Sequence, residues 1–295
     1  MNKKSWPALI RQEFPFFLSL PALIWQIMFF YIPLIFLLYL TITHIQYFSM
    51  FFNWTYIKII SRSCIMALVT ATLSIICAYP ISYFLALRAK KIKNTLLFFL
   101  LLPFWSSLLI LVYAWFFVLE KHGLINTLLL KLGIITQPLM LLNHPASVYI
   151  VMLYCYLPFM IMPIYAVLEK LDRRLFEASA DLGADGITTA LNVTLPLAFS
   201  GMRTGFFLVF VPSFGEFIIP QLIGGGKQFF VGSLISHFFL TTQHKALGAT
   251  FTIIAAAVLV CSTLLIYWLS RKVIQSPHTK TSDFAKASID TTEDK

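Results

Sequence analysis

The stretch PASVYIVMLYCYLPFMIMPIYAVL, residues 145–168, contains no Asp, Glu, Lys or Arg. A helix needs about 20 consecutive apolar residues to cross the hydrocarbon core of a bilayer. A strand barrel would instead need short segments in which apolar and polar residues alternate, and this run is long and continuous. The stretch therefore predicts a transmembrane helix.

Other parts of the chain repeat this pattern. Charge-free runs also occupy Phe14–Thr43, Ser63–Leu87, Asn94–Leu119 and Ala246–Ser270. A further apolar stretch, Leu195–Ile223, is interrupted only by Arg203 and Glu216. The sequence thus predicts an all-α integral membrane protein whose six transmembrane helices form a bundle.

The composition of the 295 residues supports the same class: 59% are hydrophobic, 12% are charged and the mean hydropathy is +0.83. Soluble domains carry about 25% charged residues, so a soluble protein with a large core would need far more polar surface than this chain has. The net charge of +10 comes from basic residues that flank apolar runs. It therefore indicates membrane topology rather than binding to nucleic acid.

The basic residues also predict the orientation, because Lys and Arg accumulate in cytoplasmic loops. With six spans, both termini lie on one side, and fifteen basic residues fall on that side against six on the other. We expect a cytoplasmic N-terminus over 1–13, a six-span domain over 14–275 and a disordered cytoplasmic tail over 276–295. The fifteen are Lys3, Lys4, Arg11, Arg88, Lys90, Lys91, Lys93, Lys170, Arg173, Arg174, Arg271, Lys272, Lys280, Lys286 and Lys295.

Catalytic and metal-binding patterns are missing from the sequence. The four cysteines form no C-x-x-C pair and are read as small buried hydrophobes, and the six histidines show no paired ligand spacing. The run Gly224–Lys227 lacks the first glycine and the final Ser or Thr of a phosphate loop, so we interpret it as a flexible turn on the outer side. We expect no metal site, no cofactor and no ATP hydrolysis by this chain. A membrane-embedded enzyme is the disfavoured reading, since acid–base chemistry needs clustered His, Asp or Glu.

One polar segment, residues 172–196, separates two of the predicted spans on the cytoplasmic side. Its core reads EASADLGADGITTALNVTLP, residues 177–196. Glycines at 183 and 186 break a helix-compatible pattern into two short helices, and Pro196 suits the start of the next span. Its acidic face argues against lying on anionic lipid, so a protein partner is the better interpretation.

The same segment resembles the permease subunits of bacterial ABC importers. In that family EAA is followed by three residues, Gly, nine residues, Ile, one residue and Leu-Pro. Here Glu177, Ala178 and Ser179 stand for EAA, then come Gly183, Val193 in place of Ile, and Leu195–Pro196. The resemblance implies a type I importer fold in which this segment is a coupling helix. It would dock on a separate ATP-binding subunit dimer, where ATP and Mg²⁺ are bound.

The likeness extends over roughly residues 15–270, and within the family it is similar to the first of the two permease types of spermidine/putrescine importers. The similar stretches are 101–119, 126–150, 156–172 and 214–225. This implies a bacterial inner-membrane protein that works with a second homologous permease and a periplasmic or lipid-anchored polyamine-binding protein. Two positions depart from relatives, which often carry Arg at Leu111 and an acidic residue at Gln221.

The candidate substrate path centres on Glu216, because charges inside membrane spans are costly and usually face the bundle interior. A buried carboxylate would attract a polyammonium ion, and Tyr113, Trp115, Tyr154 and Tyr156 would add cation–π contacts. Glu216 has two alternative roles: it pairs with a basic residue of the partner permease, or it caps a broken helix. Ordinary packing is the alternative for the aromatic residues.

These observations predict a permease subunit that imports polyamines by alternating access and takes its energy from a partner ATPase. The same class with another small solute, such as iron(III) or a phosphonate, is the alternative. Anionic cargo would favour basic residues along the path, which Glu216 does not provide.

Overall fold

The computed structural model describes residues 19–89, 91–172 and 174–293, with their side chains as far as Arg271. Every regular element in these ranges is helical. Six helical runs are long and apolar enough to cross a membrane, by length and composition. They are Ser19–Thr43, Trp54–Arg88, Leu108–Lys131, Pro145–Leu168, Gly186–Phe214 and Lys245–Arg271. The predicted all-α class and the number of spans are therefore confirmed.

The chain divides into two compact units. Unit 1 comprises residues 1–54 and 235–256, and unit 2 comprises residues 55–234 and 257–295. Unit 1 has a small aromatic core, in which the ring of Phe51 lies 5.3 Å from that of Phe251 and 6.1 Å from that of Phe238. Its elements are η1 (Ile27–Tyr31), α2 (Ile32–Thr43), η2 (Ile45–Tyr47), η3 (Ser49–Phe52), η7 (His237–Thr241) and the first part of α13 (Lys245–Glu293).

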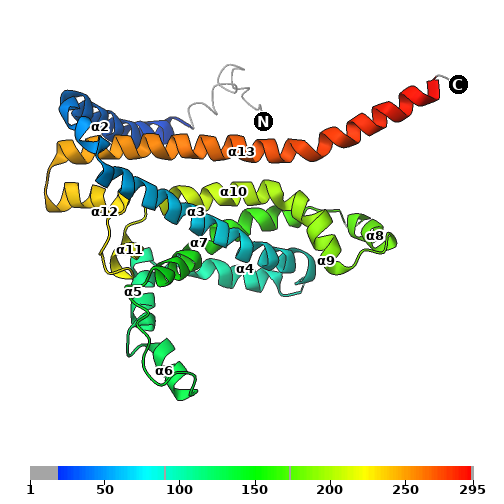
Figure 1. Ribbon diagram of the computed structural model, residues 1–295, viewed down its shortest axis with the longest axis horizontal. Coiled ribbons are helices and arrows are strands. Elements are labelled where there is room, and N and C mark those ends of the chain that lie inside the picture. Colours follow the sequence, from blue (N-terminus) through cyan, green and yellow to red (C-terminus); the bar gives the residue numbers. More distant parts are fainter. Residues whose placement is uncertain (1–18, 90, 173, 294–295) are drawn as a thin grey trace, which may run out of the picture. The chain divides into compact units, whose positions relative to one another are not determined.

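Unit 2 carries the predicted site residues, and Figure 1 labels its helices from α3 to α12. Its first elements are α3 (Trp54–Tyr83), η4 (Phe84–Arg88), α4 (Lys93–Leu101), η5 (Leu102–Trp105), α5 (Leu108–Leu119) and α6 (Leu124–Lys131). They are followed by α7 (Pro145–Leu168), α8 (Arg174–Asp181), α9 (Gly186–Thr189), η6 (Ala190–Thr194), α10 (Leu195–Phe214), α11 (Ile218–Leu222) and α12 (Val231–Ser236).

The helices α7 and α10 form the centre of unit 2 because two glycines let their backbones approach. A Cβ added to Gly201 would lie 2.7 Å from the Pro163 carbonyl oxygen, and one on Gly205 would lie 2.6 Å from the Met160 sulfur. Small residues allow this close packing in membrane helices. Helix α3 joins the pair through Ser82 Oγ, which donates to the Ile161 carbonyl at 3.1 Å.

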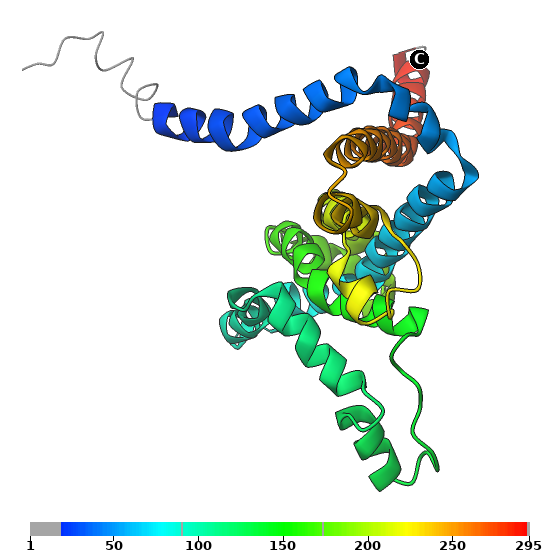
Figure 2. The same ribbon diagram turned by 90° about the vertical axis from the view of Figure 1, so that its left-hand side faces the viewer.

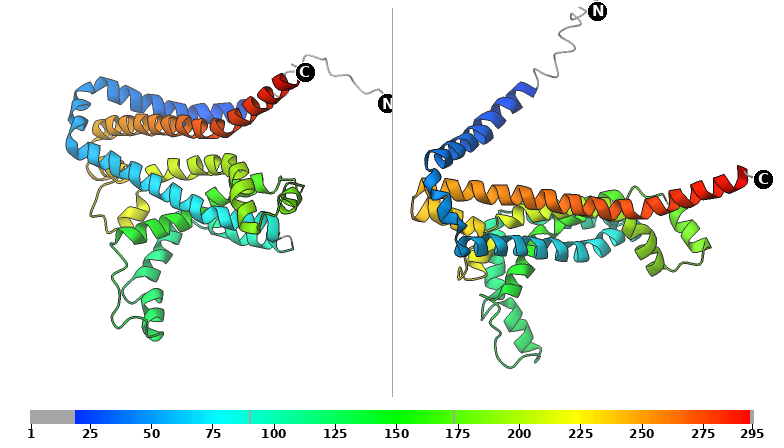
Figure 3. Two further views of the ribbon diagram at one scale, coloured as in Figure 1. Left: turned by 45° about the vertical axis from the view of Figure 1, so that its right-hand side comes forward. Right: turned by 45° about the horizontal axis from the view of Figure 1, so that its top comes forward.

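The two ends of unit 2 differ in character. The short helices α8 and α9 lie together at one end, and α5, α6 and α11 lie towards the other (Figures 1 and 3). Seen from the side, α5 and α6 project away from the α7–α10 centre (Figure 2). The predicted coupling segment and the predicted path residues are thus separated along the length of the unit.

Two predicted spans are interrupted in the structure. The run expected over Asn94–Leu119 is interrupted where Ser106 and Ser107 adopt extended backbone, and the helical run of spanning length starts at Leu108 and reaches Lys131. Pro103 lies in the last helical turn before that break, and it has no backbone N–H to donate to a helical hydrogen bond. The span expected over Leu195–Ile223 ends at Phe214, and α11 starts separately after Glu216.

The chain ends also differ from expectation or lie outside the description. The predicted cytoplasmic N-terminus, residues 1–13, lies outside the described residues, as does Arg173 within the coupling segment. The structure continues α13 as far as Glu293, where the sequence analysis expects a disordered tail from 276 on.

Candidate functional site

The segment between α8 and α9 is a sharply turned helical hairpin. Gly183 has φ +78°, a left-handed conformation that closes the end of α8. Its N–H donates to the Ala180 carbonyl at 2.9 Å, and Ala184 N–H donates to the Ser179 carbonyl at 3.1 Å. This pair of bonds satisfies the last carbonyls of the helix in a Schellman arrangement, which favours glycine at the left-handed position. The glycine predicted to permit the turn therefore does so.

Two polar contacts fix α9 against α8. The hydroxyls of Ser179 and Thr189 lie 2.8 Å apart and both side chains are buried. Asp185 caps α9, since its carboxylate accepts from Thr188 N–H at 2.9 Å. Hydrogen bonds from the Thr188 side chain and from its N–H hold the pKa of the Asp185 carboxyl below its ordinary value. Ser179, which stands where the EAA pattern has its second Ala, thus supplies one of the bonds that shape the hairpin.

The outer surface of the hairpin is apolar at its tip. Leu182 is 89% exposed and Ile187 is 71% exposed, and they lie on either side of the Gly183 turn. Glu177 and Ala178 are exposed on α8. Exposed apolar side chains next to a charge are typical of a surface that a protein partner covers. We call residues 174–189 the knob.

The knob continues into α10 through a π-helical turn that α3 holds in place. Tyr79 Oη donates to the Ala190 carbonyl at 2.5 Å and lies 2.9 Å from Thr194 Oγ1. A π-helical turn leaves local backbone groups imperfectly paired, and such turns occur frequently at functional sites. Val193 and Leu195 are half-buried in this stretch, and Pro196 is exposed in the first turn of α10.

A polar pocket of about 580 Å³ lies beside the knob. Glu177 lines it together with Arg88 and with Lys93, which forms an ion pair with Glu169. The hydrogen bond from Lys93 lowers the pKa of the Glu169 carboxyl, and the same bond raises the pKa of the Lys93 ammonium. Both groups are largely exposed, so this ion pair orders the surface rather than stabilising the fold.

Glu216 lies in the break between α10 and α11 and is only 6% exposed. Its Oε1 accepts from the N–H groups of Ile218 at 2.8 Å, Phe217 at 3.0 Å and Ile219 at 3.4 Å. Its Oε2 accepts from Tyr156 Oη at 2.7 Å. The carboxylate therefore caps a broken helix, which is one of the alternatives that the sequence left open.

The predicted aromatic residues separate into two groups. Tyr156 is buried against Glu216, while Tyr154 meets Trp115 edge-to-face with ring centres 5.2 Å apart. Tyr154 and Tyr156 both line a pocket of about 260 Å³, and Leu111 lines it from α5. Tyr113 is exposed on α5 and does not line this pocket. The structure thus joins Tyr156 to Glu216 by a hydrogen bond and Tyr154 to Trp115 by a ring contact, and both tyrosines line one pocket.

Several contributors to these sites were not identified from the sequence. Tyr79 is one of 12 tyrosines, and its bond to Ala190 joins residues 111 positions apart. Phe104 and Phe159 also line the aromatic pocket, with ring centres 4.7 Å apart. Of the contacts that shape these sites, only the cap of α9 could be recognised from the local sequence, because Asp185 stands just before a short helix.

Comparison with known proteins identifies relatives over most of the chain. The family model described as "Binding-protein-dependent transport system inner membrane component" matches residues 73–275. The spermidine/putrescine transport system permease protein PotB of Salmonella typhimurium (strain SL1344) is 36% identical over 228 residues, which cover 77% of this chain and 79% of that protein. PotB of Escherichia coli (strain K12) is 36% identical over 219 residues, covering 74% and 79%. The inner membrane ABC transporter permease protein YdcU of E. coli (strain K12) is 34% identical, covering 69% and 68%.

A solved structure has the same fold. The chain aligns with a TM-score of 0.67 and 18% identity to a bacterial ABC transporter involved in the import of the acidic polysaccharide alginate, covering 90% of this chain and 97% of that one. The alginate transporter in complex with an alginate pentasaccharide-bound periplasmic protein matches with the same score and identity. This likeness concerns the fold.

Proposed function

Since the chain belongs to the family of binding-protein-dependent transport system inner membrane components, we propose that it is the permease subunit of an ATP-driven importer for polyamines such as spermidine and putrescine. The observation that supports polyamines as the cargo is the 36% identity to spermidine/putrescine permeases, which extends over about three quarters of both chains. A second permease, two ATP-binding subunits and a cargo-binding protein outside the membrane complete the proposed importer.

The knob is the proposed contact with the ATP-binding subunits, on the cytoplasmic side of the membrane. Leu182 and Ile187 offer an apolar tip, and Glu177 offers a charge beside it for a basic residue of the partner. The bonds at Ser179–Thr189 and at the Asp185 cap keep the two short helices together when the partner moves them. ATP and Mg²⁺ are bound by that partner, and hydrolysis of the ATP supplies the energy.

The movement reaches the membrane part of the chain through α10. Tyr79 holds the π-helical turn at the start of this helix, and Gly201 seats it closely on α7. A displacement of the knob would therefore move α10 and α7 together. Alternating access follows if this movement changes which side of the membrane the path faces.

The proposed path runs past Tyr154 and Tyr156, which line the 260 Å³ pocket between α5 and α7. Aromatic faces attract ammonium groups, and these interactions strengthen where water is excluded. Glu216 adds a negative charge behind Tyr156 while its oxygens stay satisfied by the helix cap. Leu111 lines the same pocket, so the position where relatives often carry Arg presents an apolar side chain here.

Uptake of labelled spermidine tests the cargo in proteoliposomes that contain both permeases, the ATP-binding subunits and the purified binding protein. We expect ATP-dependent uptake that unlabelled spermidine and putrescine reduce, while iron(III) citrate and methylphosphonate leave it unchanged. An ATP-binding subunit without its catalytic base serves as the control for leakage. Competition by iron(III) or by the phosphonate, with none by polyamines, would overturn the proposal and establish the other cargo.

A further inference from the structure

An arginine inside the membrane-spanning part of α10 contacts an aromatic ring of α13. Cζ of Arg203 lies 5.2 Å from the centre of the Tyr267 ring, and both residues belong to unit 2. A charge within a membrane span is costly, so it usually has a partner and a function. Neither the proposed coupling contact nor the proposed path uses Arg203, and its charge therefore needs another explanation.

Arg203 points away from the helix pair at the centre of unit 2. Gly201 and Gly205 bring α10 against α7, and Arg203 stands two residues from each of them. Two residues correspond to about 200° around a helix, so Arg203 lies on the face opposite α7. The ring of Phe207, one turn further along α10, also lies near Tyr267, with ring centres 6.4 Å apart. Helix α13 therefore meets this opposite face of α10.

The contact lies close to the end of the membrane-spanning run of α13. That run ends at Arg271, four residues after Tyr267. Four residues advance a helix by about 6 Å, so Tyr267 lies roughly one turn inside the level of Arg271. An arginine side chain can extend over such a distance and place its charge at the boundary between membrane and water. Arg203 is thus within reach of the headgroup layer on the side of the knob.

One face of α13 changes in character towards this end. Val260, Leu264, Tyr267 and Arg271 follow at intervals of four, three and four residues, which places them on one side of the helix. All four side chains are exposed. The order from depth to surface is apolar, aromatic and cationic. A phospholipid presents acyl chains, its interfacial region and its phosphate in the same order.

The two cations of this surface lack a negative counterpart. Among the residues whose side chains the structure describes, Arg203 and Arg271 have no ion-pair partner, and Arg203 donates no side-chain hydrogen bond. Tyr267 covers one face of the Arg203 guanidinium, which leaves the N–H groups at its edge for an acceptor. This planar edge fits two oxygens of a phosphate. A zwitterionic headgroup would bring an ammonium that both cations repel, so a lipid with net negative charge fits better.

We infer that Arg203, Tyr267 and Arg271 form a binding site for an anionic phospholipid such as phosphatidylglycerol. Its phosphate accepts hydrogen bonds from Arg203 and pairs with Arg271, and an acyl chain covers Leu264. The inference rests on the proposed function in one respect, because that function assigns the side of the knob to the cytoplasmic leaflet. A bound lipid holds α13 to α10, the helix that continues from the knob, and so stabilises the seat of α10.

Native mass spectrometry of the complete importer tests this site. The importer is titrated in mild detergent with phosphatidylglycerol or with phosphatidylcholine. The first phosphatidylglycerol should bind roughly tenfold more tightly than phosphatidylcholine, which corresponds to one charge-assisted contact. Arg203→Leu should remove most of this preference. Tyr267→Phe keeps the ring and should bind like the unchanged chain, whereas Tyr267→Leu should bind less.

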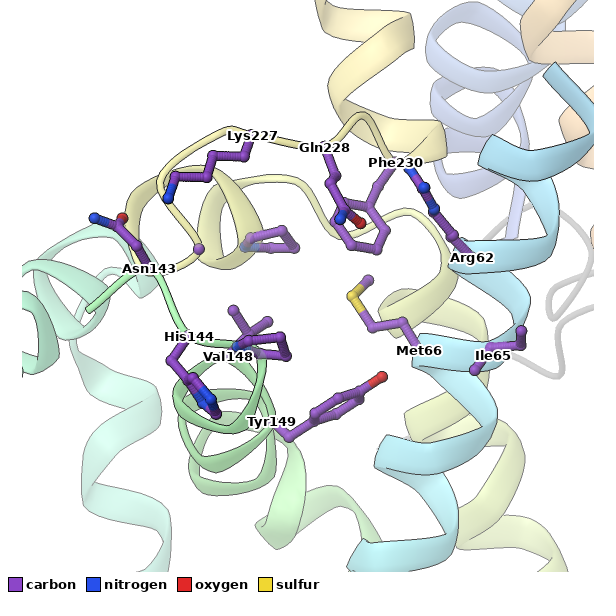
Figure 4. Close-up of a pocket in the computed structure, with 13 residues that line it drawn as sticks. Arg62, Ile65, Met66, Asn143, His144, Val148, Tyr149, Lys227, Gln228 and Phe230 are labelled. Atoms are coloured by element: carbon purple, nitrogen blue, oxygen red, sulfur yellow. The ribbon is translucent and has the colours of Figure 1, made fainter. Parts of the chain in front are cut away.

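Arg62→Leu is the matched control for the loss of one positive charge. Arg62 is partly exposed like Arg203, but it lies at the end of unit 2 away from the knob. There it lines a pocket of about 240 Å³ between α3, the start of α7 and the loop between α11 and α12 (Figure 4). The same substitution at this position leaves the exposed face of α13 untouched. It should leave the preference for phosphatidylglycerol unchanged.

Two further measurements separate the sources of phosphate and cover the case of a misfolded variant. Excess inorganic phosphate should not displace the lipid, because it has no acyl chain for the apolar part of the site. A photoreactive residue at position 264 in the otherwise unchanged importer should crosslink to phosphatidylglycerol in mixed nanodiscs. Position 265, exposed on another side of α13, should show less enrichment of phosphatidylglycerol over phosphatidylcholine.

Four outcomes overturn the inference. They are an equal loss of preference in Arg203→Leu and Arg62→Leu, displacement of the lipid by inorganic phosphate, equal enrichment at positions 264 and 265, and crosslinking of position 264 to the second permease instead of lipid. Selective lipid binding in an importer that takes up no polyamine would refute the proposed cargo and leave this inference intact.

Discussion

Replacing Gly183 by alanine tests whether the knob must keep the conformation seen here in order to couple. Gly183 has φ +78°, where an L-residue costs about 1–2 kcal/mol. A Cβ at this position meets no atom within 4 Å, so the cost comes from the backbone alone. If the ATP-binding subunit recognises this conformation, a penalty of that size reduces its affinity roughly 5- to 30-fold.

The assay is a titration of the permease pair in nanodiscs with the labelled ATP-binding subunit, combined with uptake per ATP hydrolysed. Gly186→Ala is the matched control, because Gly186 also has no atom near its Cβ position but does not have a positive φ. Gly183→Asn should recover part of the affinity, since asparagine tolerates the left-handed conformation better than alanine. Equal affinities for the two alanine variants, or no recovery with asparagine, would refute the reasoning.

Three further changes probe the link between the knob and the path. Tyr79→Phe removes one donor to the Ala190 carbonyl, which still accepts from Thr194 Oγ1 and Leu195 N–H, so the loss is that of one hydrogen bond, about 0.5–1.5 kcal/mol. ATP hydrolysis should therefore continue while uptake per ATP falls. Tyr83→Phe is its control, and similar coupling in both variants would contradict the role of Tyr79. Glu216→Gln should lower uptake and leave assembly and basal ATPase activity intact. The amide oxygen can still cap α11, but the negative charge is lost. Unchanged uptake would show that Glu216 does not contribute to the path. The lowered pKa of Asp185 means that its cap contributes fully above its ordinary pKa of 3.8 and is lost as the pH falls through the lowered value. Relative to the Asp185→Asn variant, the Thr188 amide should therefore lose protection against hydrogen exchange as the pH falls. An equal response of the two proteins would contradict this prediction.

The number of spans follows from the sequence because the bilayer imposes a simple requirement. A helix has to present apolar side chains over its full length, and charge-free runs such as Pro145–Leu168 meet this requirement without help from the rest of the chain. The knob was predictable for a similar reason. Gly183 and Pro196 act locally, so their effect on a helix can be read from neighbouring residues alone.

The ends of the spans were harder to predict because they depend on distant residues. The break before α11 depends on Glu216, whose carboxylate is held by Tyr156 from another helix, 60 positions away. Nothing in the sequence around Glu216 distinguishes a charge that lines a path from one that caps a helix. Likewise, the bond from Tyr79 to the π-helical turn connects two segments whose contact exists only in the folded chain.

The position of Glu216 connects the end of α10 with the proposed path and the knob. A buried carboxylate needs hydrogen-bond donors, and an unbroken helix offers none because its N–H groups are already used. The break at Gly215–Phe217 frees three of them for Oε1. The charge and the break therefore require each other. Helix α10 runs over 20 residues, about 30 Å, from the end of the π-helical turn to this break. One continuous helix thus has the proposed ATPase contact before its start and the carboxylate behind the aromatic pocket just after its end, so a force on the knob acts on the path without any intermediate loop.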